Sequence, residues 1–141
     1  MVGRSYPNEW RSQNVEPCTP FNRRAFGENH EELALVFLEE KGLVFVERNF
    51  HFGRYGEIDL VMRDRDTLVF VEVKARRSHR FGTPEDAVDR RKRAQIRKVA
   101  RGYVHLRQLI DFVPRFDVVA IDYVTGTGGR PEIRHLVDAF R

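Results

Sequence analysis

Two carboxylates and a lysine lie on adjacent strand-like segments, and together they could support metal-dependent chemistry. Asp59 lies in Gly56-Glu57-Ile58-Asp59-Leu60-Val61, and Glu72 and Lys74 lie in Val69-Phe70-Val71-Glu72-Val73-Lys74. A run so rich in Val and Phe is typical of a buried strand, where a charge costs free energy unless it is paired or binds a metal. Some partner must therefore stabilise these charges.

The alternation of a strand allows the two carboxylates to converge. Because successive residues point to opposite faces, Glu72 shares a face with Phe70 and Lys74. By the same rule Asp59 points with Glu57 and Val61, and away from Ile58, Leu60 and Met62.

Hard divalent cations such as Mg²⁺ or Mn²⁺ prefer oxygen ligands, and they often bind through one or two carboxylates together with waters and phosphate. Asp59 and Glu72 could hold such an ion, and the backbone carbonyl of Val73 could add a third ligand. Lys74 would then stabilise the negative charge that develops on a phosphate. The pattern predicts phosphodiester hydrolysis by a metal-activated water.

A purely structural reading of the same residues stays open. Glu72 and Lys74 could form a cross-strand ion-pair network with Asp59 and Arg76 that sets register without catalysis. For a Glu-x-Lys on a strand taken alone, this is the commoner reading.

Basic residues are concentrated beside the candidate site. Residues 74–101 hold 11 Lys or Arg against three acids, whereas the rest of the chain holds 14 against 18. Such a cluster attracts polyanions, although it also fits a solvated helix face. The candidate phosphate contacts, which would position a nucleic acid without reading its sequence, are Arg76, Arg77, Arg80, Arg90, Arg91, Lys92 and Arg93.

The composition indicates one globular domain in a reducing compartment. The chain has 141 residues, of which 41% are hydrophobic, and its single cysteine, Cys18, cannot form an internal disulfide. The sequence shows no signal peptide and no run of transmembrane length, so we expect a cytoplasmic protein without a membrane partner. Residues 1–25, with three prolines, are predicted to be a flexible leader, and residues 26–141 the domain.

The predicted elements form an α/β domain with a mixed sheet of about five strands flanked by helices. The motif Thr83-Pro84-Glu85-Asp86 is typical of a helix start, and 125–129 of a turn. The order is a helix over 28–41, strands over 43–50, 57–62 and 67–74 as an antiparallel meander, a helix from 84 to about 110, and strands over 116–123 and 133–137.

Several motifs together resemble the YraN-like family of small uncharacterised proteins, within the restriction-endonuclease-like PD-(D/E)XK superfamily. The resemblance covers residues 26–140 and leaves out the leader. The motifs are Glu31-Glu32-Leu33-Ala34, Arg48-Asn49-Phe50, Gly56-Glu57-Ile58-Asp59-Leu60, Phe70-Val71-Glu72-Val73-Lys74-Ala75-Arg76, Phe81-Gly82, Lys92 and Arg115-Phe116-Asp117-Val118.

The resemblance implies a restriction-endonuclease-like core with the order α-β-β-β-α-β-β. Asp59 and Glu72 would be metal ligands, Lys74 the catalytic lysine, and Glu31 an additional acid that reaches the metal from the first helix. The family usually has glycine where this chain has His30. An acid in the first turn also stabilises a helix through its dipole, so a purely structural role for Glu31 stays open.

Taken together, the residues and the resemblance predict a Mg²⁺- or Mn²⁺-dependent nuclease and favour DNA, branched or not, over RNA. Because the resolvases of the superfamily work as dimers, a homodimer stays open. The alternatives are a non-catalytic nucleic-acid-binding or accessory module and a protein-interaction module with a basic face.

Overall fold

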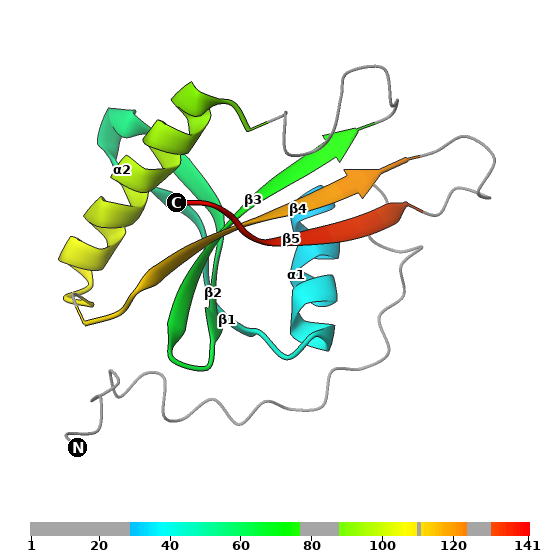
Figure 1. Ribbon diagram of the computed structural model, residues 1–141, viewed down its shortest axis with the longest axis horizontal. Helices are drawn as coiled ribbons and strands as arrows, with labels where there is room; N and C mark the ends of the chain where they lie inside the picture. Colours follow the sequence, from blue (N-terminus) through cyan, green and yellow to red (C-terminus); the bar gives the residue numbers. More distant parts are fainter. Residues whose placement is uncertain (1–28, 77–87, 110, 124–130) are drawn as a thin grey trace.

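The computed structural model describes residues 29–76, 88–109, 111–123 and 131–141. They form one five-stranded sheet with a helix on each face (Figure 1). The elements are α1 (His30–Glu40), β1 (Val44–His51), the 3₁₀ helix η2 (Gly53–Tyr55), β2 (Glu57–Asp64), β3 (Thr67–Arg76), α2 (Arg90–Leu106), β4 (Pro114–Asp122) and β5 (Glu132–Phe140).

The sheet is mixed, with the strand order β1-β2-β3-β4-β5. The first three strands form an antiparallel meander, β4 lies parallel to β3, and β5 returns antiparallel to β4. A parallel neighbour requires a crossover connection, and α2 lies in that connection. The predicted α/β class and element order are therefore confirmed, and they are consistent with a restriction-endonuclease-like core.

Alternate residues of the strands build a separate hydrophobic core on each face of the sheet. Leu68 and Phe70 pack in the core that includes Ile96, Val99 and Tyr103 of α2. On the other face, the strand residues that alternate with these pack against α1. The helix contributes Leu33, Ala34, Leu35 and Leu38 to this second core. Val69 and Val71 belong to this second core, as the period of two requires.

The predicted start and end of the second helix are wrong. The helix begins at Arg90, not near residue 84, because the Asp89 side chain accepts the Lys92 N–H as an N-cap. Val88, which we expected on the helix, is buried just before it. At the other end Gln108 adopts a positive φ of 56°, and the Leu109 N–H bonds to the Val104 carbonyl, which closes the helix after Leu106.

Some predictions fall on residues outside the described ranges: the leader, the start of the first helix at residue 28, the motif at 83–86, Ile110 and the turn at 125–129. The predicted strands lie within the observed ones or within one residue of them. β3 and β5 each extend further, to Arg76 and Phe140. None of the helices in the described part of the chain is long and apolar enough to span a bilayer.

The sheet splits between β2 and β3 at one end. Their pairing runs from Asp64 opposite Thr67 to Leu60 opposite Val71. Beyond that point β2 stays paired with β1 as far as Glu57, while β3 stays paired with β4 as far as Arg76. The split leaves one edge of β3 without its backbone neighbour at the residues where the sequence predicted chemistry.

Candidate active site

Asp59 bridges the split between the two strands. Its Oδ2 atom accepts a hydrogen bond of 2.8 Å from the backbone N–H of Val73. The carboxylate therefore takes the place of the strand partner that Val73 has lost. Since the N–H and C=O of a strand residue point to the same side, the Val73 carbonyl also faces the split.

Glu72 lies beside Asp59 and is held by two lysines. Only 5% of its side chain is exposed, and its Oε1 atom lies 3.1 Å from Lys74 Nζ and 3.4 Å from Lys92 Nζ. A buried carboxylate needs such partners, because desolvation of an unpaired charge is costly. The sequence predicted Lys74 in this place, but it assigned Lys92 to the phosphate-contacting group.

The electrostatics of Asp59 indicate a crowded anionic site. The pKa of its carboxyl is raised to about 7, first by burial and then by the negative charges of Glu72 and Glu31, while the Val73 N–H and Lys92 act in the opposite direction. Two carboxylates that share a site disfavour each other's ionised form. A bound cation would relieve that repulsion.

The first turn of α1 separates the roles of two adjacent acids. Glu32 forms an ion pair with Arg48, with 2.8 Å between Glu32 Oε2 and Arg48 Nη1. The charge of Glu31, in contrast, acts on Asp59. His30, which stands where the family usually has glycine, lies with Nδ1 3.0 Å from the hydroxyl of Tyr123, next to the end of β4. This contact connects the start of α1 to the sheet.

The carboxylates do not form a closed ligand set on their own. In the described ranges, no group of three or more His, Cys, Asp or Glu is placed to hold a metal ion. The structure brings Asp59, Glu72 and the Val73 backbone together, and it places Glu31 close enough for its charge to act on Asp59.

The predicted alternation in β2 is wrong at one residue. Leu60 and Met62 pack against α1 as expected, but Ile58 packs on the α2 side together with Val61. The change occurs across Asp59, where β2 leaves β3. Side chains alternate between the two faces only while a strand stays regular. Because β2 separates from β3 at Asp59, the side chain of Ile58 turns to the other face.

The predicted phosphate-contacting residues differ in their surroundings. Arg77 and Arg80 lie outside the described ranges, and Arg76 ends β3. Arg90 and Arg91 are exposed in the first turn of α2, whereas the Arg93 Nε donates to the Val88 carbonyl at 2.8 Å. The Arg93 side chain thus holds the backbone just before α2, and the Lys92 side chain contacts Glu72 in the candidate site.

Glu57 and the connection before β2 contribute structural contacts. Glu57 forms an ion pair with His51 on the edge strand β1, with 3.2 Å between Oε2 and Nε2. The connection between β1 and β2 contains η2, and Gln95 of α2 donates to the Tyr55 carbonyl at 2.9 Å. Lys98 Nζ lies 3.9 Å from the centre of the Tyr55 ring.

A second buried charged cluster, to which the sequence assigned no role, lies on β4 and β5. Asp117 is fully buried, and both of its oxygens accept bonds from the Arg115 guanidinium, at 2.9 Å each. Its carboxylate also lies 2.7 Å from His135 Nε2 and accepts the Asp138 N–H. Burial alone raises the pKa of Asp117, but the bonds from His135, Arg115 and Asp138 outweigh burial and lower it. This cluster fastens the irregular pairing of β4 and β5.

Comparison with known proteins places the chain in a family. The model of the uncharacterised protein family UPF0102 matches residues 30–121, which include the whole candidate site. A UPF0102 protein of Syntrophomonas wolfei is 47% identical over 112 residues, which cover 78% of this chain and 92% of that protein. UPF0102 proteins of Rhodococcus opacus (43% over 116 residues, 82% and 96% covered) and Acetivibrio thermocellus (40% over 115 residues, 82% and 88% covered) are also similar. The chain therefore belongs to the UPF0102 family, which confirms the resemblance to YraN-like proteins.

Proposed function

We propose that this protein is a divalent-metal-dependent nuclease whose site is the split between β2 and β3. The observation that carries the proposal is the convergence of Asp59 and Glu72, two poorly solvated carboxylates, with two lysines beside them. Neighbouring like charges of this kind are costly without a cation and are typical of functional sites.

The donor set suits Mg²⁺ or Mn²⁺. Asp59, Glu72 and the Val73 carbonyl offer oxygen atoms alone, and Glu31 adds a further carboxylate from α1. A bound ion of this kind polarises a phosphate ester and lowers the pKa of a coordinated water. The raised pKa of Asp59 also supports the fit, since a cation would favour the ionised carboxylate.

The two lysines would change partners when substrate binds. Both lie within 3.4 Å of Glu72 Oε1, and about a third of each side chain is exposed. If Glu72 held a cation, each ammonium group would be available for a phosphate oxygen. Lys74 would then stabilise the charge that develops at the phosphorus centre, and Lys92 would hold the neighbouring phosphate oxygens.

The first turn of α2 supports a polyanionic substrate. Arg90 and Arg91 follow directly on the N-cap Asp89, at the end of the helix that already carries a positive partial charge. Basic side chains there oppose the helix dipole, so they do not serve helix stability. They suit binding of the phosphodiester backbone that DNA and RNA share, and the proposed preference for DNA rests on the superfamily resemblance.

A second candidate function is an accessory module that binds nucleic acid without cleaving it. The observation that favours it is the double ion pair of Glu72, which satisfies the buried carboxylate without a metal. This network contains Lys92, which the sequence had assigned to the phosphate-contacting group.

Cleavage and metal binding distinguish the two functions. Labelled single-stranded, duplex, flap and four-way-junction DNAs and a structured RNA would be incubated with Mg²⁺ or Mn²⁺ and wild type, Glu72→Gln or Lys74→Ala. Calorimetric titration would measure the binding of Mn²⁺ to each of the three proteins. A nuclease loses cleavage in both variants and metal binding in Glu72→Gln; binding without cleavage in all three proteins supports the accessory module.

The adjacent acids of α1 provide a matched control. Glu31→Gln should weaken Mn²⁺ binding and cleavage, whereas Glu32→Gln should leave both near wild type because Glu32 pairs with Arg48. Equal effects of the two substitutions would remove Glu31 from the proposed ligand set and leave a role in the helix dipole.

A further inference from the structure

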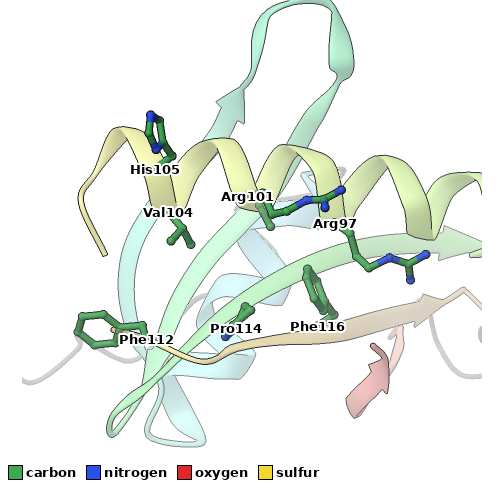
Figure 2. A pocket seen from close by; sticks show the side chains of 8 residues that line it. Arg97, Arg101, Val104, His105, Phe112, Pro114 and Phe116 are labelled. Carbon is green, nitrogen blue, oxygen red and sulfur yellow. The ribbon is translucent and has the colours of Figure 1, made fainter. Parts of the chain in front are cut away.

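A cavity of about 460 Å³ lies between the C-terminal half of α2 and the beginning of β4 (Figure 2). The helix packs on β2 and η2, which lie on the other side of β3 from β4. That placement leaves the space between α2 and the start of β4 unfilled. Figure 2 shows Arg97 and Val104 pointing from the helix toward Phe116 and Pro114. A cavity of this size can accept one or two large side chains or a small ligand.

The floor of the cavity is apolar. Its side chains are Ala100, Val104, Phe112, Pro114 and Phe116, and none of them carries a hydrogen-bond donor or acceptor. An apolar pocket of this size is typical of a binding site.

The rim of the cavity carries two arginines and a histidine. These lining residues are Arg97, Arg101 and His105, and no acid of the described ranges lines the cavity. They are spaced four residues apart on α2 and so extend over about 12 Å of the helix. Arg97 donates to the carbonyl of Arg141 at 2.6 Å, while Arg101 is exposed and forms no ion pair with the part of the chain that the structure describes.

The combination selects the chemistry of the occupant. A nucleobase would bring polar edges to a floor that cannot hydrogen-bond them, whereas a Leu, Phe or Trp side chain would fill it without such a cost. Two arginines along one edge of an apolar groove complement acids spaced along an extended or helical segment. An elongated partner also suits a rim that runs over two turns of helix.

We infer that this groove binds an acidic segment of a partner protein, with a large apolar side chain in the cavity and Asp or Glu side chains on Arg97 and Arg101. The inference is independent of the proposed nuclease, since the lining residues do not include the candidate site. It assigns a protein partner to the C-terminal half of α2 and leaves the first turn for nucleic acid.

The test is a selection from a display library of random linear peptides with the full chain as bait, followed by affinity measurements on synthetic copies of the enriched peptides. Arg101→Glu and Val104→Glu alter the rim and the floor separately. Lys98→Glu makes the same charge change on the same helix but near Tyr55, outside the cavity, and is the matched control. Circular dichroism would establish that each variant folds.

The expected result is enrichment of peptides with several acids around a Leu, Phe or Trp. Their affinity should fall about tenfold or more in Arg101→Glu and in Val104→Glu, and by less than about twofold in Lys98→Glu. Because Arg101 is exposed, its variant decides the matter if Val104→Glu fails to fold. Absence of enrichment, enriched peptides without acids, or unchanged binding by Arg101→Glu would overturn the inference. So would a loss of DNA binding in Arg101→Glu with peptide binding intact, since the rim would then serve nucleic acid.

Discussion

Replacing Asp59 with asparagine should stabilise the metal-free protein at neutral and alkaline pH. The folded pKa of Asp59 is raised from 3.8 to about 7, so the folded chain holds this proton more tightly than the unfolded chain does. The contribution of Asp59 to stability is therefore most favourable at low pH and is lost as pH rises from about 4 to about 7. At about 1.4 kcal/mol per pKa unit, the ionised side chain costs about 4 kcal/mol above pH 7 and less than about 1 kcal/mol at pH 4.

The asparagine variant removes that cost and keeps the contact, because its amide oxygen can accept the Val73 N–H. Urea unfolding followed by circular dichroism in EDTA should show an advantage of Asp59→Asn over wild type that grows by about 3 kcal/mol between about pH 4 and pH 8. Saturating Mg²⁺ should cancel much of this advantage if wild type alone binds the ion.

Glu57→Gln, two residues away on the same strand, is the matched control, since Glu57 pairs with His51 near the surface. Its effect should stay within about 0.5 kcal/mol. An advantage of Asp59→Asn that is the same at both pH values, or a loss of stability at pH 8, would refute the electrostatic reasoning.

Three further substitutions test other parts of the structure. Lys92→Gln should raise the pKa of Asp59 further, because Lys92 now lowers it; NMR titration of the Asp59 carboxyl would measure this, and an unchanged pKa would contradict it. Asp117→Asn should destabilise the fold by about 3–5 kcal/mol in urea unfolding, because Arg115 and His135 would lose a buried partner; a loss below about 1 kcal/mol would contradict this. Gly102→Ala would place a Cβ 2.7 Å from the Phe52 ring, so overpacking of about 1–3 kcal/mol should exceed the gain of about 1 kcal/mol in helix propensity; a rise in Tm would mean that Phe52 moves aside.

The pairing of Asp59 with Glu72 could be predicted because it depends on local sequence. The polar stretch before Thr67 marks a hairpin, and its tip at Arg65 and Asp66 sets the register that continues from Asp64 opposite Thr67 to Leu60 opposite Val71. Extending that register by one residue would bring Asp59 to Glu72. The period of two then placed Lys74 on the same side as Glu72.

The split itself could not be predicted, because it depends on contacts distant in sequence. Whether β2 follows β3 beyond Leu60 depends on packing against two helices, and neither is local to the hairpin. The contact of Lys92 with Glu72 depends on where α2 begins, and the Asp89 side chain caps that start.

Glu72 and Asp117 show the limit of inferring chemistry from a charge in an apolar strand. Both interrupt a run of buried residues, and both are buried. The hydrogen bonds from His135 and Arg115 outweigh burial at Asp117, so that its pKa falls. At Glu72 a second carboxylate lies nearby, and the pKa of that carboxylate, Asp59, rises. The sign of the pKa shift, which depends on three-dimensional contacts, distinguishes a carboxylate that its partners stabilise from one that a neighbouring carboxylate destabilises.

The split also explains how residues from opposite faces of the sheet reach the same carboxylate. α1 and α2 pack on different faces, yet the charges of Glu31 and Lys92, one from each helix, both act on Asp59. In a continuous sheet the backbone of β2 and β3 would lie between them. Where β2 leaves β3, the carboxylate replaces the backbone bond and lies open to both faces. Metal binding at Asp59 should therefore depend on Glu31 and on Lys92 in opposite directions: Glu31→Gln should weaken Mn²⁺ binding, and Lys92→Gln should strengthen it. Changes of the same sign would mean that Asp59 is reached from one face alone.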